Sequence, residues 1–251
     1  MAVAAIAVFA ILFFVEAGYG MLLNPKWGKT IKNKIGWLIM EAPVFIVMTT
    51  IFITYGTKVE SGNILIFSFF MFHYIHRAFI YPFLIVGNGK MPISIISMGV
   101  FFNLLNGLLQ GEWLFAHAPI GFYGDITELI VSPRFIVGTI IFFGGMALNI
   151  DSDKRLREAR REGLLRGDKP GTHYIPKGGG FKFVTSPNYL GELIEWTGFA
   201  IMSWSLPGLL FTFWTAANLI PRADATWKKH KLDRGKEIEE RRLLRVFPRI
   251  Y

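Results

Sequence analysis

Polar side chains capable of acid–base chemistry and anion binding lie inside an apolar run, residues 64–86. The run contains His73, Tyr74, Arg77 and Tyr81, and at about 100° per residue these side chains fall within about 100° of one helical face. The run is long enough to cross a bilayer, where a guanidinium costs at least about 2.5–3.5 kcal/mol. These residues therefore form either a buried polar seam between helices or a ligand site.

One acidic residue, Glu41, lies inside the preceding apolar run, roughly 9 Å from the inner end of its expected helix. Burial in a low dielectric favours the neutral form of a carboxylic acid, which can donate a hydrogen bond. A neutral acid beside the hydroxyl of Tyr74 would provide two donors suited to polarising a carbonyl oxygen. The alternative is an ion pair between Glu41 and Arg77, and both arrangements could hold in different ligand states.

A second group of polar residues forms a stripe if the helix that contains it continues past the membrane. Asn149, Asp153, Arg157 and Arg160 are spaced so that they stay within about 80° of one helical face. An aspartate for hydroxyls and two arginines for phosphate suit a phosphorylated ligand. The same segment could equally be a basic amphipathic helix on anionic lipid, and spacing alone favours that second interpretation.

Two carboxylates, Glu192 and Glu195, share a helical face with Asn188 at the start of a later apolar run. Carboxylates entering a membrane helix need partners, and the candidates are a bound ligand, Arg77, Arg157 and Arg222. Alternatively, acids near a helix N-terminus complement its dipole. His73 and His76 lack a clear third ligand, so we expect no metal site.

The elements that must position these residues are membrane spans. The 251 residues are 52% hydrophobic and 16% aromatic and include no cysteine, a composition typical of a polytopic membrane protein without disulfides or thiolate chemistry. We expect one all-α membrane domain, residues 1–251, with a cytoplasmic insert at 151–187 and a basic tail at 221–251. The seven expected spans are 2–23, 35–55, 64–86, 92–115, 129–150, 188–204 and 208–220.

The positive charges orient these spans. If the N-terminus is outside and the C-terminus inside, only Lys58 among the 27 Lys and Arg residues lies in an outer segment, while Arg77 and Arg134 lie within spans. Cytoplasmic segments of membrane proteins carry an excess of Lys and Arg, so this distribution predicts an N-terminus outside and a C-terminus inside. The net charge of +9 is then a signal of topology and of contact with anionic lipid, so we expect no nucleic-acid partner.

Several short motifs, taken together and in order, resemble the membrane steroid 5α-reductases, and they run from residue 41 to residue 222. The motifs are Glu41 with Pro43, His73-Tyr74-x-His76-Arg77 with Tyr81, Asn106-Gly107-x-x-Gln110-Gly111, Asn149-Ile150-x-Ser152-Asp153, Ile175-Pro176-x-Gly178-Gly179, Asn188-x-x-Gly191-Glu192-x-x-Glu195-Trp196, Trp204-Ser205-Leu206-Pro207 and Arg222-Ala223.

The resemblance implies a seven-helix membrane enzyme that uses NADPH to reduce the Δ4 double bond of 3-oxo-Δ4-steroids to 5α-steroids. It implies that Glu41 and Tyr74 hold the keto oxygen while hydride reaches the β-carbon. The residues that would hold NADPH by the same resemblance are Arg77, Tyr81, Asn149, Asp153, Arg157, Arg160, Asn188, Glu192 and Arg222. We expect a monomer in the bacterial inner membrane or the endoplasmic reticulum, with steroid and membrane lipids as partners and the cofactor site facing the cytoplasm.

Some positions depart from the family pattern. Met40 stands where steroid enzymes often carry Gln, and Asp224-Ala225-Thr226-Trp227 replaces a histidine-rich run before His230. These departures leave the substrate open, so a reductase of another enone or enoyl lipid, such as a polyprenol or an enoyl thioester, is an alternative. An isoprenylcysteine-type methyltransferase and a lipid-binding scaffold are weaker alternatives.

Overall fold

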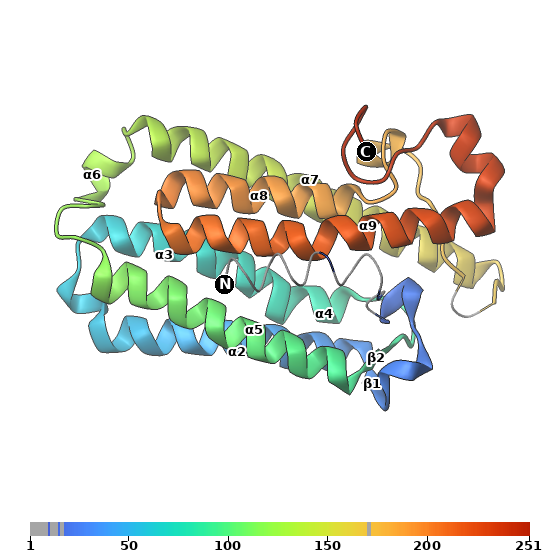
Figure 1. Cartoon of the computed structure of the whole chain (residues 1–251), viewed down its shortest axis with the longest axis horizontal. Coiled ribbons are helices and arrows are strands. Elements are labelled where there is room, and N and C mark those ends of the chain that lie inside the picture. Colours follow the sequence, from blue (N-terminus) through green and yellow to red (C-terminus); the bar gives the residue numbers. More distant parts are fainter. Residues whose placement is uncertain (1–9, 11–14, 16–17, 170–171) are drawn as a thin grey trace.

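The structure is a computed structural model that describes residues 10, 15, 18–169 and 172–251. Its long helices lie alongside one another in a bundle, along the longest dimension of the molecule (Figure 1). The first expected span, 2–23, falls mostly outside the described residues, and so its prediction is not tested.

The first half of the described chain contributes three long helices. Helix α2 is Asn33–Tyr55, and α3 is Ser61–Tyr74, which continues as a π-helix, Ile75–Ile80, into α4, Tyr81–Leu84. Helix α5 is Ile93–Glu112 and ends in a second π-helical turn, Trp113–His117. The first π-helical segment contains Arg77, and such wide turns are frequent at functional sites.

The second half begins with the short helix α6, Ile126–Leu129, and then forms a three-helix layer. Helix α7 is Pro133–Leu165, α8 is Pro187–Ser203 and α9 is Leu206–Arg241. A tight turn at Trp204 and Ser205 reverses the chain between α8 and α9, where the Ser205 hydroxyl accepts a hydrogen bond from the Gly208 N–H at 3.1 Å. The turn lies where the sequence predicted an interruption.

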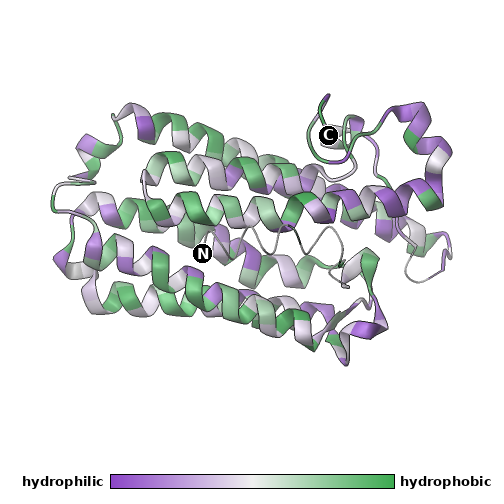
Figure 2. Ribbon diagram, in the orientation of Figure 1, coloured by the Kyte–Doolittle hydropathy of each residue, from purple (hydrophilic) through white to green (hydrophobic). Residues whose placement is uncertain are grey.

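Polar and irregular segments gather at the end of the bundle where α7 and α9 project beyond the other helices (Figures 1 and 2). Here strand β1, Thr30–Lys32, pairs antiparallel with β2, Lys90–Pro92. The chain is thus mostly helical, as predicted, but this small sheet departs from a strictly all-α fold. Its register, Thr30 opposite Pro92, ties the start of α2 to the start of α5.

Four helices among the described residues are long and apolar enough to cross a membrane: Asn33–Tyr55, Ser61–Leu84, Ile93–His117 and Pro133–Leu165. They correspond to the second to fifth expected spans. The sixth and seventh correspond to α8 and α9, which are helical but are not among the helices that are long and apolar enough to cross a membrane. The seven-span topology with its N-terminus outside therefore stays a prediction.

Two helices continue further than the sequence predicted. Helix α7 runs to Leu165, so the first 15 of the 37 residues in the expected insert, 151–187, belong to this helix. Helix α9 runs through Pro221 to Arg241 with a kink at Arg234, whereas Pro221 was expected to mark the end of the last span. The ring of Pro221 is accommodated within α9, and the expected tail is largely a continuation of that helix.

Glycines let α7 and α8 approach at backbone distance. A Cβ atom at Gly138 would lie 2.6 Å from the backbone nitrogen of Met202, and Cβ atoms at Gly145 and Gly191 would collide with the backbone of the facing helix. Close approach through small residues is a common way for membrane helices to associate. The neighbouring Gly144 does not share this role, because a Cβ there meets nothing within 4 Å.

We therefore predict that Gly145→Ala lowers the melting temperature of the purified protein, because the added methyl group would force α7 and α8 apart. Overpacking of this kind costs about 1–3 kcal/mol. Gly144→Ala is the matched control, since the neighbouring methyl group faces open space and alanine favours a helix. Equal melting temperatures for the Gly145→Ala variant and the unmodified protein would contradict the role assigned to the α7–α8 contact.

Candidate functional site

Two adjoining cavities lie between the helices, and Tyr19, Trp37, Arg77 and Leu219 line both of them. The first, here called the apolar compartment, has mainly hydrophobic walls from α2, α5 and α9. Its apolar lining is Trp27, Trp37, Met40, Ile95, Met98, Phe102, Phe211, Trp214 and Leu219, and its polar lining includes Glu41, His73, Tyr74, Asn103 and Glu192. The structure therefore brings the two predicted oxygen-binding residues, Glu41 and Tyr74, into one cavity.

Amides on α5 orient both of these residues. The Asn103 side chain donates to the Glu41 carboxyl at 3.2 Å and to the Met40 carbonyl at 2.7 Å. The Asn106 side chain donates to the Tyr74 hydroxyl oxygen at 3.3 Å. Because that oxygen accepts from Asn106, its own hydrogen is free for another acceptor. Both asparagines lie within the expected span 92–115, but the sequence alone did not predict their partners.

Arg77 stands at the junction of the two cavities and is held from several sides. Its guanidinium lies 4.5 Å from the ring centre of Trp37 and 4.8 Å from that of Tyr81. It forms ion pairs with Asp153 at 3.7 Å and with Glu192 at 3.5 Å. These pairs replace the ion pair with Glu41 that the sequence left open, and Glu41 instead contacts Asn103.

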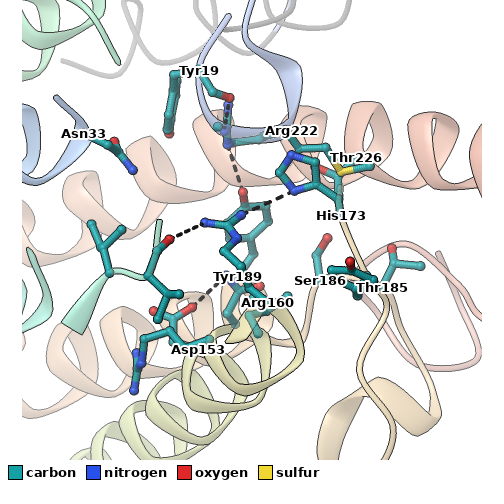
Figure 3. Close-up of a pocket in the computed structure, with 18 of the residues that line it drawn as sticks. Tyr19, Asn33, Asp153, Arg160, His173, Thr185, Ser186, Tyr189, Arg222 and Thr226 are labelled. Carbon is teal, nitrogen blue, oxygen red and sulfur yellow. Dashed lines mark hydrogen bonds between the residues drawn. The ribbon is translucent and has the colours of Figure 1, made fainter. Parts of the chain in front are cut away.

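The second cavity, here called the polar compartment, lies between α4, α7, α8, α9 and the loop before α8. It is lined by seven of the nine residues predicted to hold a cofactor: Arg77, Tyr81, Asp153, Arg157, Arg160, Asn188 and Arg222. Figure 3 shows Asp153 and Arg160, both on α7, and Arg222 on α9 pointing toward this space. The predicted stripe on α7 is therefore one wall of a cavity, which favours the ligand interpretation over lipid contact.

The remaining two predicted residues lie beside this cavity. The Asn149 side chain donates to the Asn188 carbonyl at 2.9 Å, and the Asn188 side chain donates to Asp153 at 3.2 Å. Glu192 lines the apolar compartment and pairs with Arg77. Asn149 is thus placed to hold the start of α8 against α7, without lining either compartment.

The three arginines of the polar compartment other than Arg77 differ in how many partners their guanidinium groups have. Arg222 donates to the Tyr189 hydroxyl at 2.9 Å and to the Tyr19 carbonyl at 3.0 Å, and it stacks on the Tyr19 ring. Arg160 donates to the Val86 carbonyl at 3.3 Å. Within the part of the chain that the structure describes, the Arg157 guanidinium has no ion-pair partner within 4 Å. Arg157 therefore offers a cation to an anionic ligand.

Buried polar atoms without a hydrogen-bond partner show that the polar compartment suits a polar ligand. Eight such side-chain atoms occur among the described residues, and four of them belong to residues that line this cavity: Asn33 Oδ1, Asp153 Oδ2, Ser186 Oγ and His230 Nδ1. Leaving a buried polar group unsatisfied costs about 1–3 kcal/mol. A ligand rich in hydroxyls, amides and phosphates, such as a nicotinamide dinucleotide, would satisfy these atoms.

Two histidines in this cavity were not predicted as site residues. Burial, reinforced by the nearby Arg160 charge, lowers the pKa of His173 to about 4. Burial and the neighbouring His173 lower the pKa of His230 to about 4 as well. Both rings are therefore neutral near pH 7 and offer hydrogen bonds to a ligand without adding positive charge.

His173 lies in a loop that reaches the cavity through contacts with a distant helix, so the spacing of nearby residues could not identify it. It is fixed by Arg241 near the end of α9, whose guanidinium donates to the carbonyls of Pro176 and Phe181 at 2.8 Å each. Gly178 takes a φ of +82° within this loop, a conformation that favours glycine. Arg234, also on α9, donates to the His173 carbonyl at 3.2 Å, so distant residues hold the loop over the cavity.

The structure is a helical protein with candidate membrane spans and two adjoining cavities, one lined mainly by apolar side chains and the other rich in arginines. Comparison with known proteins identifies the family. Residues 89–251 match the family described as 3-oxo-5-alpha-steroid 4-dehydrogenase. The chain is 36% identical over 226 residues to steroid 5-alpha-reductase DET2 of Arabidopsis thaliana, which covers 87% of this chain and 82% of that protein.

Two further relatives agree. Steroid 5-alpha-reductase DET2 of Solanum lycopersicum is 34% identical over 253 residues, covering 99% of this chain and 93% of that protein. Human 3-oxo-5-alpha-steroid 4-dehydrogenase 1 is 35% identical over 221 residues, covering 86% of this chain and 80% of that protein. The chain belongs to the steroid 5α-reductase family, as its motifs indicated.

Proposed function

We propose that this protein reduces the Δ4 double bond of 3-oxo-Δ4-steroids with NADPH, giving 5α-steroids. The observation that carries the proposal is the junction at Arg77, where an apolar cavity containing Glu41 and Tyr74 adjoins a polar cavity containing three further arginines. The printed names of the relatives support the steroid as the substrate class. A steroid would occupy the apolar compartment and the cofactor the polar one.

The reaction depends on the oxygen-binding pair. The Tyr74 hydroxyl, oriented by Asn106, donates its hydrogen to the keto oxygen, and a protonated Glu41, oriented by Asn103, donates a second hydrogen bond. Both residues are buried, and preorganised donors in a dry site stabilise negative charge that develops on oxygen. Withdrawal of electrons through the conjugated system makes the β-carbon electrophilic.

The residues of the polar compartment would bind and orient the cofactor. When bound, a reduced nicotinamide supplies the hydride that the β-carbon accepts. Arg157, Arg160 and Arg222 would contact phosphates, while Asp153 would accept hydrogen bonds from ribose hydroxyls. Arg77 and Tyr81 would lie on the cofactor side of the junction, with Asn149, Asn188 and Glu192 maintaining the α7–α8 wall.

Membrane lipid and a lipid substrate would be the partners of this protein, which would act as a monomer with its cofactor site facing the cytoplasm.

The first experiment measures NADPH oxidation by the purified protein in detergent, with and without progesterone or testosterone. We expect a product two mass units heavier with 5α stereochemistry. Cofactor binding without steroid turnover would favour the alternative, another enone or enoyl lipid, and absence of cofactor binding would contradict the proposal.

The oxygen-binding role predicts that Glu41→Gln and Tyr74→Phe lower kcat by about 100-fold or more, since each removes or weakens one donor. Their dissociation constants for NADPH should stay close to that of the unmodified protein, because neither residue lines the polar compartment. Steady-state kinetics and a cofactor titration measure the two effects. Glu112→Gln, which alters a half-buried acid outside both compartments, is the control, and unchanged turnover in Glu41→Gln would remove that role.

The phosphate-binding role predicts that Arg157→Ala weakens NADPH binding by roughly 10-fold or more, because charge-assisted hydrogen bonds contribute about 1.5–3 kcal/mol. Arg161→Ala is the matched control, since Arg161 is exposed on the same helix and does not line the compartment. Isothermal titration with NADPH measures both variants. Equal dissociation constants for the two would take Arg157 out of the site.

A further inference from the structure

His73 and Glu195, which lie on α3 and α8, form a buried pair beside the oxygen-binding residues. The Nδ1 atom of His73 lies 2.7 Å from Oε1 of Glu195. His73 is 6% exposed and Glu195 is fully buried. The histidine ring also packs against Trp196, with ring centres 4.5 Å apart. Two titratable groups are therefore held in one fixed geometry within the bundle.

This geometry leaves one nitrogen of His73 for the cavity. His73 lines the apolar compartment together with Glu41 and Tyr74, and its ring centre is 5.0 Å from that of Tyr74. Since Glu195 engages Nδ1, the other ring nitrogen is the one available to a ligand. Among the described residues, Nε2 makes no hydrogen bond. It is also absent from the fully buried polar atoms that lack a partner, so it is not completely enclosed by protein. A proton on Nε2 would therefore face the substrate.

The proposed reaction needs such a proton. Saturating a conjugated double bond adds a hydride at the β-carbon and a proton at the α-carbon, which is two bonds from the keto oxygen. Glu41 and Tyr74 are committed to that oxygen, and Glu192 is paired with Arg77. The remaining titratable groups that line the apolar compartment are His73 and Tyr19. His73 contacts Tyr74 directly, whereas the Tyr19 ring is covered by the Arg222 guanidinium.

We propose that His73, held by Glu195, donates the proton to the α-carbon of the substrate. This assignment rests on the proposed function for the position of the keto group. The electron pair of the enolate forms the new C–H bond as the Nε2–H bond breaks, and the enolate returns to a ketone. His73 enters this step as an imidazolium and leaves it as a neutral imidazole, with its Nδ1–H still donating to the Glu195 carboxylate. A hydronium ion from solvent then returns a proton to Nε2 and is left as water. Glu195 is a positioning residue that acts through His73.

The reverse of this step gives a test that needs no cofactor. The purified protein is incubated in D2O with the saturated 3-oxo-5α-steroid, and deuterium at the α-carbon on the double-bond side is followed by NMR and mass spectrometry. A neutral His73 would remove one α-hydrogen while Glu41 and Tyr74 stabilise the enol. We expect the protein to exchange one of the two hydrogens at this carbon stereospecifically and faster than buffer alone.

Variants separate a chemical role of His73 from a structural one. The amide nitrogen of asparagine can replace Nδ1, so His73→Asn keeps a donor to Glu195 but removes the nitrogen that faces the cavity. We expect at least 100-fold slower exchange in His73→Asn, in keeping with the usual size of general acid–base catalysis. We expect the melting temperature of this variant to be unchanged. His76→Gln is the matched control, because this neighbouring histidine lines neither compartment.

Two further variants keep the proposal open to refutation. If His73→Asn fails to fold, Glu195→Gln carries the test, with a loss of exchange of about 10-fold expected because the charge that holds the imidazolium is gone. Exchange at the normal rate in His73→Asn or Glu195→Gln would overturn the proposal, and so would loss of exchange in Tyr19→Phe with normal exchange in His73→Asn. NADPH-dependent reduction by the unmodified protein is measured separately, so a failure of the proposed function is recognised independently.

Discussion

A guanidinium buried in a membrane helix is the constraint on which the rest of this structure depends. Arg77 can remain charged there only because partners from several helices surround it, since an unpaired ion in a low dielectric carries a large desolvation cost. Asp153 comes from α7, Glu192 from α8 and Trp37 from α2, while Tyr81 follows on its own segment. The cation therefore determines which faces of these helices meet.

The position of Arg77 also separates the two compartments by polarity. On one side the cavity walls are aromatic and aliphatic, with a few donors, and on the other side arginines and unpartnered polar atoms gather. The π-helical segment Ile75–Ile80 inserts its wide turn where this change occurs. The proposed steroid and the proposed cofactor would thus meet at a common boundary while each remains in its own environment.

Periodicity in the sequence predicted the helices and the faces of their polar residues. Asp153, Arg157 and Arg160 of the predicted stripe lie on one wall because α7 is continuous through this segment, and the spacing of nearby residues contains that information. The partners of a face are not local: His73 and Glu195 are 122 positions apart, and the loop of His173 is held by Arg234 and Arg241 from α9. Spacing alone also favoured lipid contact for the stripe, since the opposing wall was not visible in it.

The α7–α8 contact explains how these distant pairs become possible. Gly145 faces the backbone of Glu195, and a Cβ at Gly191 would lie 2.5 Å from the backbone nitrogen of Asn149. Because the two backbones approach this closely, Asn188 can bond to Asp153, and Glu192 and Glu195 project from α8 toward α3. Larger residues at these glycines would move the carboxylates away from Arg77 and His73 together. The small residues of the helix contact are therefore as much a part of the site as the charged residues they position.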